Sequence, residues 1–579
     1  MGAARGTGLD MYTMRQGPRR KVCPFPRAFP DSFPQMTPQQ LIDQALSHHR
    51  QGNVVEAERL YRAALKSDGR NATLLYLLGV ALAQQGRNNE ALPFLGQSIA
   101  INPQMPDALF ARAQLLLAAG RAAEALADIE RGRALTPANP VMLMAEGDVL
   151  SALGRFESAL QAYDRALALA PGNPQVLNNR GNALRQLGRS HEALESYDQA
   201  LRLKPDYFDL LYNRAVLLRQ LERFEAALAN YEAALRLQPD SLHALVGRAR
   251  TLHDLGRTDA AIESYRQILA QSDSAEAANG LAELLYSQGA IEDAFRMFRA
   301  RAERAHGPAG SPLPAPSPNP PHRDKHDKEQ AAHLADLLDS PAEGLCFHLD
   351  AGARVSGGAV NANIPRQEIE RQWQTQRPQI IVVDDLLTQE ALTALRRFCE
   401  ASTIWQKTYD AGYLGTTPET GFACPLLAQI AEEFPRALPK VFRAHPLKYL
   451  WAFKYDSTLA GINIHADFAA VNINFWITPD EANQDPESGG LVVWDKAAPL
   501  DWDFEKYNTD ESAIRRFLTE AGAKPVTIPY RANRAVIFDS DLFHETDRLS
   551  FQEGYQNRRL NVTLLYGERE KQAQGGYTA

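Results

Sequence analysis

The chain has 579 residues, which is too long for one hydrophobic core, so we expect two or more domains. Hydrophobic residues make up 45% and charged residues 23%, as is typical of globular proteins. The net charge of -8 disfavours a nucleic-acid partner, and no apolar run reaches the ~20 residues that cross a bilayer, so no membrane partner is expected either.

Residues 1–36 are rich in proline and contain no signal-peptide core, so they are predicted to be a disordered N-terminal segment. A helical pattern starts directly after Met36, which suggests the hypothesis that translation begins there.

Residues 37–305 repeat with a period of 34. The repeat is marked by glycines at 52, 86, 120, 154, 188 and 256, with Glu222 in the remaining slot. An alanine follows five residues after each slot, and prolines at 103, 137, 171, 205 and 239 keep the same register. Gly289 and Ala294 continue the pattern one residue short and mark an eighth, degraded unit.

Each unit is predicted to be two amphipathic helices joined by a tight turn. Glycine permits the positive φ that ends the first helix, alanine allows close helix packing, and proline ends the second helix. The period and the segment GNALRQLGRSHEALESYDQALRLKPD resemble tetratricopeptide repeats. We therefore expect a superhelix whose concave face binds a protein or peptide.

Four asparagines fall on the expected first helices of units five and six, namely Asn178, Asn179, Asn182 and Asn213. They are candidates for hydrogen bonding an extended peptide, as in the repeats of O-linked sugar transferases, which these units resemble. The alternative is that they are exposed polar or inter-helix residues.

Residues 306–330 are predicted to be a linker, since seven prolines between Pro308 and Pro321 favour a stiff, extended chain. His322 and His326 lie beside Asp324 and Asp327, and we interpret this stretch as a solvated charge run. A short helix is expected around Glu329 to Leu338.

Residues 340–570 have short strand-like runs instead of helical periodicity. QIIVVDD predicts a strand, TQEALTALRRFCEAS predicts a helix capped by Thr388, and a further helix is expected around Leu426 to Phe434. Later strands are expected in LWAFKYD, GINIHADF, VNINFWIT, GGLVVWD, RAVIFDSD and RRLNVTLLYG. Many short strands separated by turns indicate a jelly roll.

His465 and Asp467 are two residues apart in one expected strand, so their side chains point to the same side. His544 follows 77 positions after Asp467. Two histidines and one carboxylate on one face of a six-coordinate ion form the facial triad typical of non-haem Fe(II) oxygenases. Asp539 and Asp541 are candidates for orienting His544.

Alternation along the last strand selects a partner for an anionic co-substrate. Arg559 shares a face with Asn561 and Thr563, whereas Arg558 shares the apolar face. Because the polar face is expected to point into the barrel, Arg559 is the better candidate and Arg558 the second. Trp476 and Trp494 are expected to pack in the core.

Together, these runs resemble the 2-oxoglutarate- and Fe(II)-dependent oxygenase superfamily, and the opening IIVVDDLLTQEALTALRRF is similar to its prolyl-4-hydroxylase-like branch. The resemblance spans roughly residues 378 to 567 and implies a double-stranded β-helix with flanking helices. It implies iron bound by His465, Asp467 and His544, 2-oxoglutarate held by Arg559 with Tyr455 as a second contact, and dioxygen as the oxidant. The insertion from Ala498 to Lys524 and the spacing between His544 and the arginine depart from the usual pattern.

The expected function is thus a cytoplasmic dioxygenase that hydroxylates a side chain of a protein or peptide docked by the repeats. The alternative is a non-catalytic repeat scaffold with a degenerate oxygenase-like domain, and a sugar transferase ranks below both. Four scattered cysteines, Cys23, Cys346, Cys399 and Cys424, without a CxxC pair, disfavour a disulfide framework and fit a reducing compartment. Cys399 and Cys424 are expected to be buried and unreactive.

Overall fold

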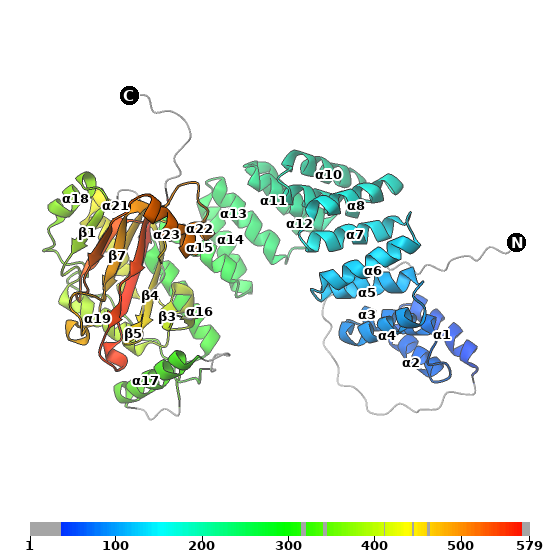
Figure 1. Cartoon of the computed structure of the whole chain (residues 1–579), viewed down its shortest axis with the longest axis horizontal. Helices are drawn as coiled ribbons and strands as arrows, with labels where there is room; N and C mark the ends of the chain where they lie inside the picture. The colour runs from blue at the N-terminus through cyan, green and yellow to red at the C-terminus, as the bar shows by residue number, and fades with distance from the viewer. Residues whose placement is uncertain are drawn as a thin grey trace, which may run out of the picture. The chain divides into compact units, whose positions relative to one another are not determined.

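The computed structural model describes residues 36–313, 320–339, 344–409, 411–442, 445–459 and 464–569 (Figure 1). The predicted disordered segment 1–36 therefore lies outside the described residues, apart from Met36. The chain divides into two compact units, Met1–Thr251 and Leu252–Ala579. Among the described residues, no helix combines the length and apolarity that a membrane span requires.

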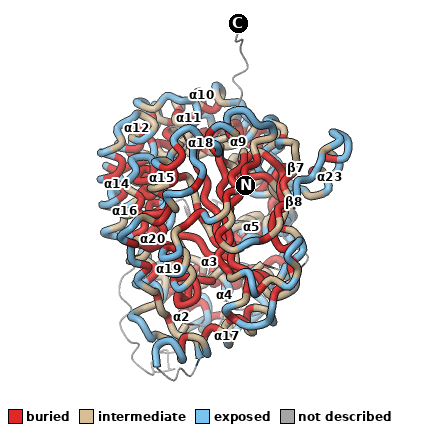
Figure 2. Tube along the Cα trace, turned by 90° about the vertical axis from the view of Figure 1, so that its left-hand side faces the viewer, coloured by how far each residue is buried: buried red, intermediate tan, exposed pale blue. Residues whose placement is uncertain are grey.

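Sixteen helices follow one another through the described residues 38–306. They are α1 (Pro38–Arg50), α2 (Val54–Leu65), α3 (Ala72–Gln84), α4 (Asn88–Ile101), α5 (Pro106–Ala118), α6 (Ala122–Leu135), α7 (Pro140–Ala152), α8 (Phe156–Leu169), α9 (Pro174–Gln186), α10 (Ser190–Leu203), α11 (Phe208–Gln220), α12 (Phe224–Leu237), α13 (Leu242–Asp254), α14 (Thr258–Gln271), α15 (Ala275–Ser287) and α16 (Ile291–His306). Along these helices buried residues alternate with exposed ones at helical spacing, and Figure 2 colours the chain by this burial.

The helix ends follow the predicted register. Gly188 has a φ of +74° directly after α9, which a glycine adopts without strain. Ala193 of α10 is fully buried, and α10 ends two residues before Pro205. A Cβ on Gly181 of α9 would lie 2.4 Å from the ring of Tyr197, so this glycine is required for close packing of the two helices. The repeat register is therefore confirmed.

Glu222 occupies the glycine slot of its unit with a φ of +57°. An L-residue in this conformation costs about 1–2 kcal/mol, and the extra freedom of an unfolded glycine offsets part of that cost. We expect Glu222→Gly to raise the free energy of unfolding of the N-terminal unit by about 0.5–1 kcal/mol, as measured by urea denaturation. The control Glu195→Gly, within α10, is expected to lower the free energy of unfolding by about 1 kcal/mol. Equal losses of stability in both variants would contradict this account.

The C-terminal unit contains antiparallel sheets. The largest has the strand order β1-β9-β6-β12-β4-β3-β2, a second has the order β10-β7-β8, and β11 pairs with β5. The strands are β1 (Ile380–Val383), β2 (Lys407–Tyr409), β3 (Tyr413–Thr416), β4 (Leu447–Tyr455), β5 (Thr458–Leu459), β6 (Val471–Trp476), β7 (Leu491–Ala497), β8 (Pro525–Ile528), β9 (Ala535–Asp539), β10 (Leu542–Thr546), β11 (Leu549–Ser550) and β12 (Leu560–Tyr566).

Helices flank these sheets, and two of them follow the sequence predictions. Helix α19 (Gln389–Ala401) is capped by the side chain of Thr388, and α20 (Pro425–Ala437) lies where a helix was expected. The others are α17 (Pro321–Leu338), α18 (Arg366–Thr375), α21 (Pro439–Phe442), α22 (Phe504–Asn508) and α23 (Glu511–Glu520), with short 3-10 turns η1 (Pro418–Thr420), η2 (Asp480–Ala482) and η3 (Tyr555–Asn557). The insertion between Ala498 and Lys524 thus forms α22 and α23, and half of the residues of α23 are exposed.

The linker prediction for 306–330 is wrong in its second half. Helix α17 begins at Pro321, eight residues before the expected start, and His326 is fully buried instead of solvated. Helix α17 contacts the carbonyl oxygen of Trp405 and the side chains of Asp456 and Tyr555. These residues are far away in the sequence, so the residues around the helix give no sign of its burial.

The last repeat helices pack within the C-terminal unit. Arg299 of α16 donates hydrogen bonds to the carbonyl oxygens of Leu349 and Asp350 at 2.8 and 2.7 Å. Lys448 of β4 forms an ion pair with Glu283 of α15 at 2.8 Å. The array predicted as one domain, 37–305, is therefore divided, and its last helices belong to the compact unit that contains the sheets.

Candidate metal centre

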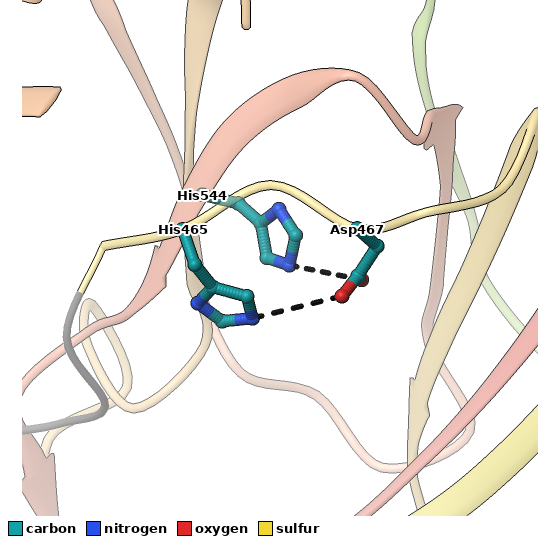
Figure 3. Close-up of side chains that lie close together, drawn as sticks. All are labelled: His465, Asp467 and His544. Carbon is teal, nitrogen blue, oxygen red and sulfur yellow. Dashed lines mark ion pairs between the residues drawn. The ribbon is translucent and has the colours of Figure 1, made fainter. Parts of the chain in front are cut away.

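His465, Asp467 and His544 converge on one point in the C-terminal unit (Figure 3). One ligand atom from each residue lies within 4.8 Å of the other two. The Nε2 atom of His544 is 3.4 Å from Asp467 Oδ2, and the Nε2 atom of His465 is 3.9 Å from Asp467 Oδ1. Asp467 and His544 are buried, and His465 is half-buried at the open side of the cluster.

Backbone pairing brings the two histidines together. The N–H of His465 donates to the carbonyl oxygen of His544 at 3.0 Å, and the N–H of His544 donates back at 2.8 Å. His465 forms an isolated β-bridge with His544 of β10. It therefore does not lie in the regular strand predicted for GINIHADF. The expected alternation still holds, because the residues beside each histidine, Ala466 and Phe543, point into a separate apolar cluster.

The insertion supports this pairing from outside. The carbonyl oxygen of Tyr507 in α22 accepts from the N–H of Ala466 at 3.0 Å. The side chain of Asn508 donates to the carbonyl oxygen of Ala466, also at 3.0 Å. Helices α22 and α23 contribute Tyr507, Ile514 and Leu518 to the apolar cluster behind the histidines. The insertion therefore lies where it holds the His465 segment in place.

Neighbouring polar groups orient the ligand side chains. Nδ1 of His544 contacts the carbonyl oxygen of Leu542 at 3.1 Å, which leaves Nε2 directed at the centre. Asn472 of β6 donates to Asp467 Oδ2 at 2.7 Å. Burial raises the pKa of Asp467, but His544, His465 and Asn472 together outweigh it and hold that pKa below its usual value.

A backbone carbonyl oxygen, that of Leu542, therefore contacts His544, whereas the candidates for this role in the sequence were Asp539 and Asp541. Asp541 forms an ion pair with Arg569 at 2.6 Å, and burial raises the pKa of Asp541 to about 6.

The donor set fits a divalent metal ion. An ion bound at about 2.1 Å places neighbouring ligand atoms about 3 Å apart, so the two histidine–aspartate distances need only small side-chain rotations to close. Two neutral imidazoles and one carboxylate leave a divalent ion with a net charge near +1 and, in octahedral geometry, three adjacent positions for other ligands. Among the described residues, this is the one group of three or more His, Cys, Asp or Glu side chains with such spacing.

Arg559 lies in the core of the same unit, beside Tyr455 and Trp476. Its guanidinium carbon is 4.8 Å from the ring centroid of Tyr455 and 5.5 Å from that of Trp476. Nε and Nη2 donate to the carbonyl oxygens of Gly489 and Gly490 at 2.7 and 3.0 Å, whereas Nη1 has no hydrogen-bond partner among the described residues. Burial lowers the pKa of Arg559. A buried cation with an unused donor is suited to bind an anion.

Tyr455 and Thr546 connect this arginine to the β10 strand that carries His544. The hydroxyl groups of Tyr455 and Thr546 are 3.4 Å apart, and Thr546 is two residues from His544 on the same strand face. Gly490 provides the close approach of β7 to β8, because a Cβ there would lie 1.9 Å from the carbonyl oxygen of Ile528. Thr546, Gly490 and Asn472 could not be predicted from sequence, because a single small or polar residue in one strand carries no distinguishing signal.

Arg558 lies on the other side of the strand and is paired with acidic groups. Its Nε is 2.8 Å from Glu329 Oε2, and its Nη1 is 3.4 Å from Asp456 Oδ1. The two arginines therefore differ in surroundings: Arg559 packs against Tyr455 and Trp476, whereas Arg558, expected on an apolar face, pairs with carboxylates.

The asparagines of the repeat array bond to one another and to neighbouring polar side chains. Asn213 donates to Asn178 at 3.0 Å, Asn178 donates to Asn179 at 3.1 Å, and Asn179 donates to Asp148 at 2.8 Å. Asn182 accepts from Tyr197 at 2.6 Å. These side chains connect helices α7, α9 and α11, as the inter-helix interpretation requires. Asn178, Asn179 and Asn213 also line a cavity of about 480 Å³.

The remaining core predictions agree with the structure. Trp476 is fully buried, and Trp494 packs against the apolar cluster behind the histidines. Cys399 and Cys424 are buried and free, and burial raises the pKa of the Cys424 thiol to about 12. Cys23 lies outside the described residues.

Models of the tetratricopeptide repeat family match residues 42–106, 144–208, 212–275 and 247–308, and a second tetratricopeptide model matches residues 82–149. Residues 42–308 form a tetratricopeptide repeat array. An array of this kind supports protein interaction.

Several solved structures are similar to the tetratricopeptide array. A tetratricopeptide repeat protein from Parabacteroides merdae is 20% identical, with 43% of this chain and 98% of that chain covered and a TM-score of 0.37. A thermophilic tetratricopeptide repeat protein from Thermus thermophilus is 29% identical, with 31% and 98% covered and a TM-score of 0.29. YrrB, described as a tetratricopeptide repeat protein with an unusual peptide-binding site, is 22% identical, with 32% and 95% covered and a TM-score of 0.27. No curated protein matches the sequence.

Proposed function

We propose that the C-terminal unit is an Fe(II)- and 2-oxoglutarate-dependent dioxygenase that hydroxylates a protein or peptide side chain. The observation that carries the proposal is the convergence of His465, Asp467 and His544 on one point. Two imidazoles and one carboxylate are the ligands typical of non-haem Fe(II) oxygenases, whereas structural zinc sites more often use cysteine thiolates.

The order of the strands supports a double-stranded β-helix for this unit. Strands β4, β6, β9 and β12 all belong to the large sheet, where their spatial order is β9-β6-β12-β4. The His465 bridge, β10, β7 and β8 are neighbours in the other sheet. Successive segments thus alternate between the two sheets, except that β7 and β8 follow one another in one sheet. That is the connectivity expected of a jelly roll.

Iron and 2-oxoglutarate, when bound, would supply the oxidation of a substrate C–H bond by dioxygen. The residues of the chain bind and orient the reactants. Asp467 would contribute one negative charge to the metal site, and the half-buried edge at His465 leaves that side open. Arg559 would hold the distant carboxylate of 2-oxoglutarate with its unused Nη1, and the hydroxyl of Tyr455 would be a second contact.

A protein or peptide is the proposed substrate class, because tetratricopeptide repeats precede the oxygenase-like region in one chain. Docking of a partner on the repeats would raise its local concentration at the site. The helices α14 to α16 at the end of the array belong to the same compact unit as the metal centre.

Release of succinate from 2-oxoglutarate by the purified chain with added Fe(II) tests the proposal. Turnover above the metal-only background, even without a protein substrate, is the expected result. If the chain binds the metal but releases no succinate above this background, the alternative is favoured, which is a repeat scaffold whose β domain is not catalytic.

Arg559→Leu is expected to raise the KM for 2-oxoglutarate by about 30-fold or more, because loss of one partner of a buried charge pair costs about 2–5 kcal/mol. Arg559→Lys should recover only part of the affinity, since an ammonium group lacks the planar fork. Arg371→Leu, which removes an exposed arginine of α18, is the matched control. Steady-state succinate release measures all three. An unchanged KM in Arg559→Leu would assign the anchor elsewhere.

A further inference from the structure

Helix α17 follows the proline-rich stretch and inserts polar side chains into the C-terminal unit. Arg323, His326 and Gln330 are at most 4% exposed. Arg323 donates to the carbonyl oxygen of Trp405, and Gln330 donates to the carbonyl oxygen of Ser402 at 2.9 Å. Buried polar groups are costly unless they are paired, so these contacts specify one position for the helix.

An alternating chain of charges connects α17 to two strands of the large sheet. Glu329 of α17 pairs with Arg558 at 2.8 Å, and Arg558 pairs with Asp456 at 3.4 Å. Asp456 in turn pairs with Lys325 of α17 at 3.2 Å. The chain of ion pairs therefore starts and ends on α17 and encloses Arg558, whose side chain is only 5% exposed. Because Arg558 itself is buried, its two pairs are less weakened by salt than surface pairs are.

The residues held by α17 are the sequence neighbours of the two proposed co-substrate contacts. Arg558 precedes Arg559, and Asp456 follows Tyr455. The N–H of Tyr455 donates to the carbonyl oxygen of Arg559 at 3.0 Å, so the two segments are directly paired. Because successive side chains of extended chain point to opposite faces, contacts on the α17 face constrain the side chains on the interior face.

Lys454, on the other side of Tyr455, adds to this layer. Its ammonium nitrogen lies 4.7 Å from the ring centroid of Trp405 and 3.9 Å from that of Tyr555. The rings of His326 and His333 on α17 contact the same Tyr555, at 5.6 and 5.1 Å. Burial, followed by the charge of Arg558, lowers the pKa of Lys454 to about 7. The layer between α17 and the sheet is thus packed continuously behind Tyr455 and Arg559.

We propose that α17 is a positioning helix for the co-substrate pocket, in which Glu329 acts through Arg558 to set the geometry with which Arg559 binds 2-oxoglutarate. This inference rests on the proposed function, since it concerns the same pocket. Glu329 does not contact the co-substrate. Its effect is therefore on the affinity for the dicarboxylate and not on the reacting atoms.

Glu329→Gln in the full chain tests the inference, with Lys328→Gln as the matched control because Lys328 is the adjacent residue of α17 and is exposed. Loss of a contact that orients a ligand group lowers affinity by about ten-fold or more, so the KM and the Kd for 2-oxoglutarate should rise by about that factor in Glu329→Gln. The kcat at saturating 2-oxoglutarate should stay within about two-fold of wild type. Lys328→Gln should change neither constant.

Calorimetric titration of 2-oxoglutarate into the Mn(II)-loaded chain measures the Kd, and succinate release measures KM and kcat. In the double variant Glu329→Gln with Arg558→Gln, the affinity loss should be smaller than the product of the two single losses, because both act through one pair. If Glu329→Gln does not fold, Lys325→Gln replaces it and should raise the KM through Asp456.

An unchanged Kd in Glu329→Gln, or a lower kcat with an unchanged KM, would overturn the positioning role while leaving the proposed function intact. Failure of the wild-type chain to bind 2-oxoglutarate would instead overturn the proposed function and the inference with it.

Discussion

His465→Ala is expected to reduce 2-oxoglutarate turnover with Fe(II) by more than about 100-fold, because loss of a group that only orients a metal ligand already costs about 10–100-fold. Two ligands, Asp467 and His544, would remain, and neither alone fixes the ion. Asp467→Ala should cause a similar loss of turnover, since it removes the carboxylate whose negative charge partly neutralises the metal ion. Succinate release under saturating Fe(II) measures both effects.

A second readout is independent of turnover. A metal ion present at about 100 times its Kd stabilises the folded state by about 2.7 kcal/mol, so Mn(II) should raise the Tm of the wild-type unit and not that of His465→Ala. His191→Ala is the matched control, because the side chain of His191 in α10 is 90% exposed. Equal turnover and equal metal-dependent stabilisation in wild type and His465→Ala would refute the metal assignment.

A fragment that starts at residue 340, the boundary predicted from sequence, is expected not to fold cooperatively. It lacks α14 to α17 and so leaves the carbonyl oxygens of Leu349 and Asp350 without Arg299, and Arg558 without Glu329. Removal of one partner from a buried ion pair costs about 3–5 kcal/mol, a large part of the 5–15 kcal/mol that stabilises a typical domain. Near-UV circular dichroism during thermal unfolding measures the transition.

The matched fragment is 252–579, which retains the whole compact unit and should unfold in a single transition. A fragment 340–579 with the same Tm as 252–579 would show that α14 to α17 are dispensable and that the boundary near 340 is correct.

Local patterns identified much of this molecule. The glycine and alanine register predicted the repeat helices because both residues act within one unit, at the turn and at the helix contact. Alternation distinguished Arg559 from Arg558 because the two faces of an extended chain differ in polarity. The pattern of His465 and Asp467 likewise depends only on strand geometry, and their side chains point to one side even though His465 forms just an isolated bridge.

Other features arise from residues far apart in sequence. The carbonyl oxygen of Leu542 contacts His544, and a backbone acceptor carries no sequence signal. His326 reads as part of a charged, solvated run, yet it is buried because α17 meets Tyr555, more than two hundred residues later. The division of the array after Thr251 likewise reflects contacts of α15 and α16 with β4, η1 and α20.

By itself, the sequence determined the repeat period, the repeat helices, several of the longer strands and the residue types of the candidate metal centre, since each depends on near neighbours and on backbone geometry. Only the tertiary structure decided which side chains meet, which polar groups are buried, and where the compact units end. Those outcomes depend on long-range packing, in which a charge such as Arg558 is accommodated by partners that the local sequence does not contain.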